Sequence, residues 1–211
     1  MASESDGNAR RRLGLLIDYG GVLTSNLFDS FDAFCRQEGL ESQAIATRFR
    51  GDRAARELLI GLETGAIPEA EFEGQFAEML GVQPTGLIDR LFGGSHPDEP
   101  MLDMVRHARE AGIRTGLISN SWGTSRYDRA RLAELFEGIV ISGEEGLRKP
   151  APEMYTLGAE RIGLAPDECV YVDDLPFNLA PAAELGMATV HHVCSEQTIA
   201  ELERLLGVPL R

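Results

Sequence analysis

Five short apolar runs, separated by stretches with helical spacing, restrict the fold of this sequence more than any other feature. Each run is bounded mostly by Gly, Ser or Asp, as buried strands are. The runs cover residues 13–19, 113–119, 138–142, 169–174 and 188–193. Helical patterns precede or separate the last four of them, at 99–112, 125–137, 151–163 and 179–186. This alternation predicts an α/β fold with a Rossmann-like parallel sheet and helices on both faces.

The interval from 25 to 95 interrupts the alternation because it contains no convincing strand. Apolar residues recur there at helical spacing in three stretches, 28–40, 46–65 and 68–82, with Gly or Pro as punctuation. We therefore expect a small α-helical domain, residues 25–95, inserted into a core formed by 13–24 and 96–211. Residues 1–12 precede the first strand and are expected to be disordered.

Composition limits the possible partners. The formal net charge of −14 repels nucleic acids and anionic lipid surfaces. The three cysteines are widely spaced and form no metal-binding pattern, and no window approaches the roughly 18 apolar residues that span a bilayer. We expect a cytoplasmic protein that binds neither nucleic acid nor membrane. The sequence leaves its oligomeric state open.

Polar residues stand at or just beyond the ends of four predicted strands. Ligands bind at the carboxyl ends of parallel strands, so we expect these residues to meet at one edge of the sheet. Three carboxylates there would repel one another unless a hard cation such as Mg²⁺ compensated them. A carboxylate can act as a nucleophile, and a hydroxyl and an ammonium can orient phosphoryl oxygens. The pattern predicts phosphoryl transfer by Asp18, Ser119, Asn120, Lys149, Asp173 and Asp174.

Four stretches resemble, in order, motifs one to four of the haloacid dehalogenase-like hydrolase superfamily: LLIDYGGVLT, GLISNS, SGEEGLRKPAPEMY and CVYVDDLPFNLAPAAELGM. The resemblance covers essentially the whole chain after the first dozen residues, and the helical insert matches the cap domain of that family. It implies a Mg²⁺-dependent hydrolase. The activity expected from it is that of a small-molecule phosphatase, which forms an aspartyl-phosphate on Asp18 from a small phosphorylated substrate.

The resemblance also implies which residues hold the substrate. Ser119 and the adjacent Asn120 are expected to bind the phosphate. Lys149, the only lysine of the chain, is expected to steady both the nucleophile and the phosphoryl group. Trp122, two residues after Asn120, either lines the substrate pocket or packs at the domain edge.

A second set of implied roles concerns the metal. Asp18, the backbone carbonyl of Gly20 and Asp174 are expected to bind Mg²⁺. Asp173 is expected to be a supporting acid, and Asn178, one helical turn later, to orient the site.

Gly20 is the main departure from the family pattern. Phosphatases of the superfamily usually carry a second aspartate two positions after the nucleophile, and it donates a proton to the leaving group. A glycine keeps the carbonyl but lacks the acid, whose loss typically costs about 10²–10⁴-fold in rate for a poor leaving group. Activity should then favour acyl or aryl phosphates.

Two alternatives follow from the same residues. A binding or regulatory protein with this fold and little turnover would also account for Gly20. A metal-independent haloacid dehalogenase would use the same nucleophile, although the paired acids Asp173 and Asp174 argue against it.

Other candidate residues have simpler interpretations. Arg50, Arg53 and Arg56 form a basic stretch on the insert, which is either a solvated face or the source of one contact to a second anionic group. His191 and His192 lie in the last predicted strand without a nearby acid or cysteine motif, which favours packing over metal binding.

Overall fold

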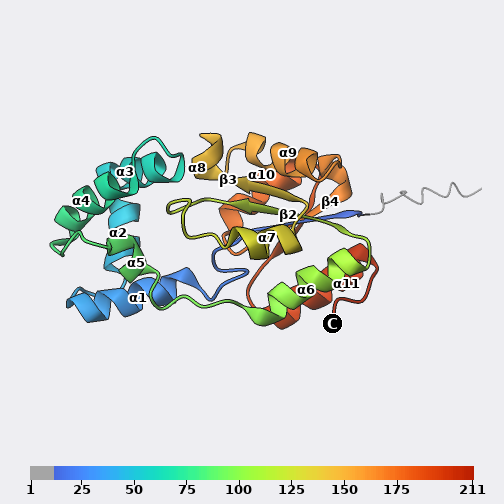
Figure 1. Ribbon diagram of the computed structural model, residues 1–211, viewed down its shortest axis with the longest axis horizontal. Coiled ribbons are helices and arrows are strands. Elements are labelled where there is room, and N and C mark those ends of the chain that lie inside the picture. Colours follow the sequence, from blue (N-terminus) through green and yellow to red (C-terminus); the bar gives the residue numbers. More distant parts are fainter. Residues whose placement is uncertain (1–11) are drawn as a thin grey trace, which may run out of the picture.

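A five-stranded parallel sheet forms the centre of the computed structural model, which describes residues 12–211 (Figure 1). The strand order is β3-β2-β1-β4-β5, and every neighbouring pair is parallel. All five predicted strands are confirmed, each one to three residues shorter than the apolar run that predicted it. Their bounds are β1 Gly14–Ile17, β2 Arg114–Ser119, β3 Gly138–Ile141, β4 Cys169–Asp173 and β5 Ala188–His191.

Helices cover both faces of the sheet, because side chains alternate between the two faces along each strand. Leu15 and Ile17 of β1 pack into a cluster with α6 (Glu99–Glu110), α7 (Arg129–Leu135) and α11 (Ser195–Leu206). Leu16 points to the opposite face and packs with α9 (Pro152–Arg161) and α10 (Pro176–Glu184). Figure 1 shows α9 and α10 on one side of the sheet and α6 and α11 on the other. The predicted α/β class is therefore correct.

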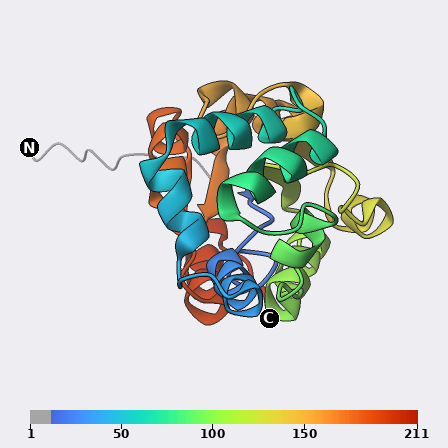
Figure 2. The same cartoon turned by 90° about the vertical axis from the view of Figure 1, so that its left-hand side faces the viewer.

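The interval 25–95, called the insert below, is helical. Figure 2 looks onto the insert and shows its helices in front of the sheet. The insert has an apolar cluster of its own, in which Phe34, Phe72 and Phe76 are among the largest buried side chains. Its helices are α1 Leu27–Glu38, α2 Ala44–Gly51, α3 Arg53–Glu63, α4 Glu69–Leu80 and α5 Leu87–Leu91.

The two chain segments that join the insert to the core run side by side. Thr24 and Pro97 form an antiparallel bridge, and the Ser25 N–H donates to the His96 carbonyl over 2.8 Å. The chain thus leaves and re-enters the core at one place. That residues 25–95 fold as a separate domain stays a prediction.

Four elements of the structure were not predicted, and one predicted segment lies almost entirely outside the described residues. α5 and α11 were not expected, nor were the one-turn helix α8 (Ser142–Glu145) and the 3₁₀ turn η1 (Pro166–Glu168). The segment expected to be disordered, residues 1–12, lies outside the described residues except for Arg12, whose guanidinium donates to the Gly186 carbonyl over 3.0 Å.

Within residues 12–211, none of the helices combines the length and the apolar character needed to cross a membrane.

Asp52 explains why the helical pattern at 46–65 becomes two helices. Its carboxylate accepts hydrogen bonds from the backbone N–H groups of Ala54 (2.8 Å) and Ala55 (3.4 Å), which begins α3. An N-cap of this kind contributes about 1 kcal/mol. We expect Asp52→Ala to lower the free energy of unfolding in urea by about that amount. The matched variant Asp52→Asn keeps the acceptor and loses only a partly exposed 3.5 Å ion pair with Arg48, so it should cost less. Equal losses would contradict the capping role.

Candidate functional site

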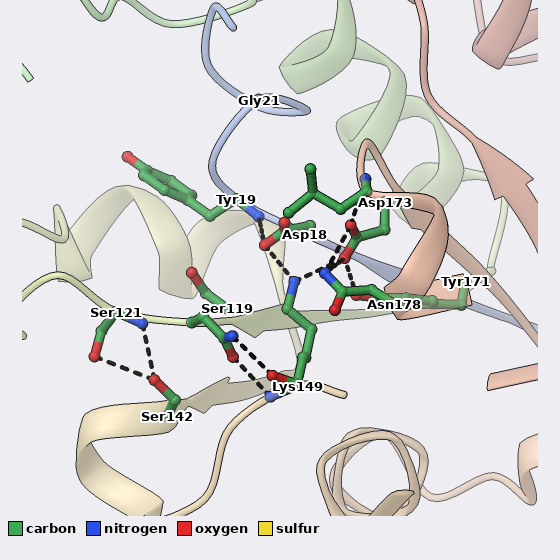
Figure 3. Close-up of polar contacts among 12 residues, drawn as sticks. Asp18, Tyr19, Gly21, Ser119, Ser121, Ser142, Lys149, Tyr171, Asp173 and Asn178 are labelled. Carbon is green, nitrogen blue, oxygen red and sulfur yellow. Dashed lines mark hydrogen bonds and ion pairs between the residues drawn. The ribbon is translucent and has the colours of Figure 1, made fainter. Parts of the chain in front are cut away.

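A buried ammonium group lies between two carboxylates at the carboxyl ends of β1 and β4 (Figure 3). Lys149 Nζ is 2.8 Å from Asp18 Oδ1 and 2.8 Å from Asp173 Oδ2, and its side chain is 1% exposed. Asp18 follows β1 and Asp173 ends β4. The two strands are neighbours in register, with Ile17 opposite Val172, which places both carboxylates at the same height of the sheet.

Asn120 fixes the backbone that carries Lys149. Its Nδ2 donates to the Lys149 carbonyl over 3.1 Å, and its Oδ1 accepts from the Lys149 N–H over 2.8 Å. Both ends of the Asn120 amide are therefore engaged within the protein. The side chain positions the lysine, and the phosphate contact expected of Asn120 stays a prediction.

Asp173 is fully engaged as an acceptor. Its Oδ1 receives hydrogen bonds from the Leu175 N–H (2.9 Å) and from Asn178 Nδ2 (3.0 Å). Its Oδ2 receives the Tyr171 hydroxyl and the Lys149 ammonium. This acid contacts Lys149, and Asn178 in turn contacts the acid. The supporting roles expected of Asp173 and Asn178 stay predictions.

Burial and mutual charge set the protonation of this group. Burial alone would lower the pKa of Lys149, but Asp18 and Asp173 raise it above its usual value. Burial alone would raise the pKa of Asp173, but Lys149 and the hydrogen bonds from Lys149, Tyr171 and Asn178 hold it below its usual value. Lys149 and Asp173 are therefore an ion pair at neutral pH.

The other two acids behave differently. Burial raises the pKa of Asp18 to about 8, with Lys149 opposing it and the neighbouring carboxylates adding to it. Burial and the charge of Asp173 raise the pKa of Asp174 to about 6. One lysine is thus too little positive charge for three acids at this edge of the sheet.

These three acids suit a hard divalent cation. Asp18, Asp173 and Asp174 each offer an oxygen atom, and the three atoms lie within 4.8 Å of one another. Asp174 Oδ1 is buried and has no hydrogen-bond partner among residues 12–211. The backbone of Gly21, at φ +79°, lies so close that a Cβ atom there would be 2.5 Å from Asp174 Oδ2. An unpartnered carboxylate oxygen beside two other acids is the donor set that Mg²⁺ prefers.

Two tyrosines near the site were missed by the sequence analysis. The Tyr127 hydroxyl lies 2.8 Å from Ser119 Oγ, and the Tyr171 hydroxyl contacts Asp173. Tyr171 was detectable, because a strand places residues two apart on the same face. Tyr127 lies in the irregular segment after β2, and no sequence pattern there places it beside Ser119.

A cavity of about 730 Å³ opens above the acids, between the core and the insert. Asp18, Ser119, Lys149 and Asp174 line its core side. Trp122 lines it too, and its indole ring also packs against several phenylalanines of the insert. Trp122 thus both lines the cavity and packs at the domain edge, and that the cavity is the substrate pocket stays a prediction.

The remaining candidate residues differ in whether they line the cavity. Arg50 and Arg56 line the cavity, whereas Arg53 is not among its lining residues and pairs in solvent with Glu57. His191 Nε2 lies 3.0 Å from the Asp174 carbonyl oxygen, and His192 Nδ1 lies 3.0 Å from Thr198 Oγ1. Neither histidine is part of the acid cluster.

The sequence matches the haloacid dehalogenase-like hydrolase family over residues 14–186. Because this match covers most of the chain, the protein belongs to that family. The chain spans between 10% and 24% of the length of four curated relatives that it matches, so their activities as whole proteins are not transferred to it.

Three further relatives match most of their own length. Hexitol phosphatase A of Escherichia coli (strain K12) is 28% identical over 205 residues, 93% of this chain and 88% of that protein. Sesquiterpene phosphatase astK of Aspergillus oryzae is 30% identical over 152 residues, 69% of this chain and 77% of that protein. A HAD family enzyme from Bacteroides thetaiotaomicron, solved in complex with magnesium and inorganic phosphate, is 26% identical with a TM-score of 0.64, covering 85% of this chain and 93% of that one.

Asp173 and Asp174 are expected to differ in their contribution to stability. Asp173→Ala would leave the buried Lys149 with one carboxylate fewer, and removing one partner of a buried pair costs about 3–5 kcal/mol. Asp174→Ala would remove a carboxylate that, within residues 12–211, forms no ion pair with Lys149 and has one buried oxygen without a hydrogen-bond partner. In urea unfolding with EDTA, we expect a loss of that size for Asp173→Ala and no loss for Asp174→Ala. Similar losses for both would contradict the division of roles.

His192 predicts a pH dependence of stability. Burial lowers its pKa from 6.5, and although Asp98 opposes this shift, the pKa stays lowered. The unfolded chain then takes up the imidazole proton at a higher pH than the folded chain, so the free energy of unfolding falls as the pH drops below about 6.5. Between about pH 7.5 and about pH 5.5, the free energy of unfolding measured in urea should fall less for His192→Gln than for the wild type. Equal losses would exclude His192 as the source.

Proposed function

We propose that this protein is a Mg²⁺-dependent phosphatase of small molecules that acts through an aspartyl-phosphate on Asp18. The observation that carries the proposal is the contrast between its acids. Lys149 contacts both Asp18 and Asp173, whereas Asp174 presents a buried oxygen that has no hydrogen-bond partner within residues 12–211. Two relatives that match over most of their length are named phosphatases, and a homologue was solved with magnesium and phosphate, which supports the proposal.

Asp18 is positioned for attack through one of its two oxygens. The Tyr19 N–H (2.7 Å) and Lys149 Nζ (2.8 Å) both bind Oδ1. Within residues 12–211 no hydrogen bond to Oδ2 is present, so Oδ2 is the oxygen available to a phosphorus atom. The new bond from Asp18 to phosphorus forms as the bond to the leaving oxygen breaks. Water then attacks the same phosphorus atom, which releases phosphate and restores Asp18.

Other residues of this chain hold the phosphoryl oxygens and the metal. Lys149 supplies a fixed positive charge, and the Ser119 hydroxyl, beside that of Tyr127, supplies a donor. We assign Asp18 and Asp174, with the backbone carbonyl of Gly20, to the metal. When bound, Mg²⁺ supplies the positive charge that keeps the acids ionised and neutralises the phosphoryl oxygens.

The insert acts as the cap in this proposal, because residues on both sides of the cavity would surround a bound substrate. We also propose a cytoplasmic location, which the three unpaired cysteines support.

Substitution of the nucleophile tests the proposal. Wild-type protein should hydrolyse p-nitrophenyl phosphate and acetyl phosphate with Mg²⁺ and not with EDTA, because neither leaving group requires an acid. Asp18→Asn should lower kcat by at least about 10³-fold, because an amide cannot form the covalent intermediate. Phosphate release measured at saturating substrate gives the result.

A second variant separates loss of metal from loss of the nucleophile. Mg²⁺ should raise the Tm of the wild type, by an amount equivalent to about 2.7 kcal/mol at 100 times its Kd, and Asp174→Ala should abolish that rise. Activity retained by Asp18→Asn would contradict the proposal. A folded protein that binds Mg²⁺ but turns over neither substrate would be a binding or regulatory protein. Metal-independent release of halide from a 2-haloacid would identify a dehalogenase.

A further inference from the structure

Much of the lining of the cavity is apolar and rich in aromatic rings, and this set of side chains is called the apolar wall below. Its members come mainly from the insert, with Trp122 and Phe177 from the core. A group of such side chains around one cavity indicates a ligand with a matching apolar part. They include Phe28, Phe31, Phe49, Ile60, Trp122 and Phe177.

Exposure concentrates at this wall. Four large apolar side chains are exposed within residues 12–211: Phe28 at 44%, Ile60 at 42%, Phe177 at 58% and Val193 at 69%. The first three line the cavity and Val193 is not among its lining residues. Single exposed apolar residues are ordinary, but three around one opening form a patch that a ligand can cover.

The arginines that line the cavity offer little to a polar ligand. Of the four arginines that line it, Arg126 pairs with Glu69 and Asp89, and Arg148 pairs with Glu63. The Arg56 guanidinium donates to two backbone carbonyls, including that of Phe49 at 3.2 Å. Three of the four are thus already engaged by the protein.

Leu27 occupies the space beside Gly20. A Cβ atom at Gly20 would lie 2.7 Å from Leu27 Cδ1, so an apolar side chain from α1 fills the direction in which an acid at position 20 would extend. The leaving oxygen therefore receives no proton from this position. A leaving group that departs as a weak base needs none.

We propose that the substrate is an aryl phosphate, the phosphate ester of a phenol, whose ring lies against the apolar wall while its phosphate meets Asp18 and Lys149. This proposal rests on the proposed phosphatase function. The bond between Asp18 and phosphorus forms as the bond between phosphorus and the phenolic oxygen breaks. The electron pair leaves with the phenolate, which takes its proton from water. The apolar wall and the missing acid then serve the same substrate.

Four substrates separate the two parts of the proposal. 1-Naphthyl phosphate and acetyl phosphate both have a good leaving group, but only the first has an aromatic ring. Hexyl phosphate and sorbitol 6-phosphate both have a poor leaving group, and the first is apolar whereas the second is polar. We expect kcat/KM for 1-naphthyl phosphate to exceed that for acetyl phosphate by about 10-fold and that for hexyl phosphate by about 10²-fold.

Paired variants test the apolar wall itself. Phe177→Ser and Ile60→Ser should each lower the ratio of kcat/KM for 1-naphthyl phosphate to that for acetyl phosphate by about 5- to 10-fold, because each removes exposed apolar area that the ring would cover. Val193→Ser, which changes an exposed side chain away from the cavity, should leave that ratio unchanged.

The outcomes distinguish this proposal from the phosphatase function. Turnover of acetyl phosphate with sorbitol 6-phosphate or hexyl phosphate preferred over 1-naphthyl phosphate would overturn the aryl proposal alone. So would an unchanged ratio in both Phe177→Ser and Ile60→Ser. No turnover of any of the four, with folded protein and Mg²⁺, would overturn both proposals together.

Discussion

The Lys149 ammonium group, held between Asp18 and Asp173, is the interaction on which the rest of the site depends. Taking a charge out of water costs several kcal/mol unless opposite charges and hydrogen bonds compensate it. Here the compensation comes from the ends of two adjacent strands, and Asn120 at the end of β2 holds the backbone of the lysine. Three neighbouring strands of the sheet must therefore be in register before the lysine can be buried. The sheet and the site form together for this reason.

The insert is coupled to the same interaction through the residue before Lys149. Glu63, at the end of α3, is buried and pairs with Arg148, and the Ser142 hydroxyl donates to the Glu63 carbonyl. A Cβ atom at Gly65 would lie 2.5 Å from the Gly143 carbonyl oxygen, so only glycine permits this approach of insert to core. The insert thus contacts the core close to Lys149 and contributes apolar side chains to the cavity that the acids line.

The sequence predicted those features that depend on local pattern and chain topology. Alternating strands and helices gave the parallel sheet, and parallel strands bring the polar residues at their ends to one edge, as Asp18, Ser119 and Asp173 show. Features that depend on packing across the chain were not predictable in this way. Leu27, the first residue of α1, fills the space beside Gly20 because the turn at residues 20–23 directs the chain back, and no periodicity locates that contact. The amide of Asn120 is engaged by a backbone 29 residues away. Tyr127 lies within the helical pattern at 125–137, but α7 begins only at Arg129, and Tyr127 reaches Ser119 from the irregular segment before it.

The stereochemistry of phosphoryl transfer tests most directly whether Asp18 is the nucleophile. A substrate that is chiral at phosphorus, prepared as an isotopically labelled phosphorothioate aryl ester, would be hydrolysed in labelled water with Mg²⁺. Attack by Asp18 followed by attack of water inverts phosphorus twice, so this account predicts net retention of configuration. Net inversion would show that water attacks the phosphorus directly, and it would contradict the account.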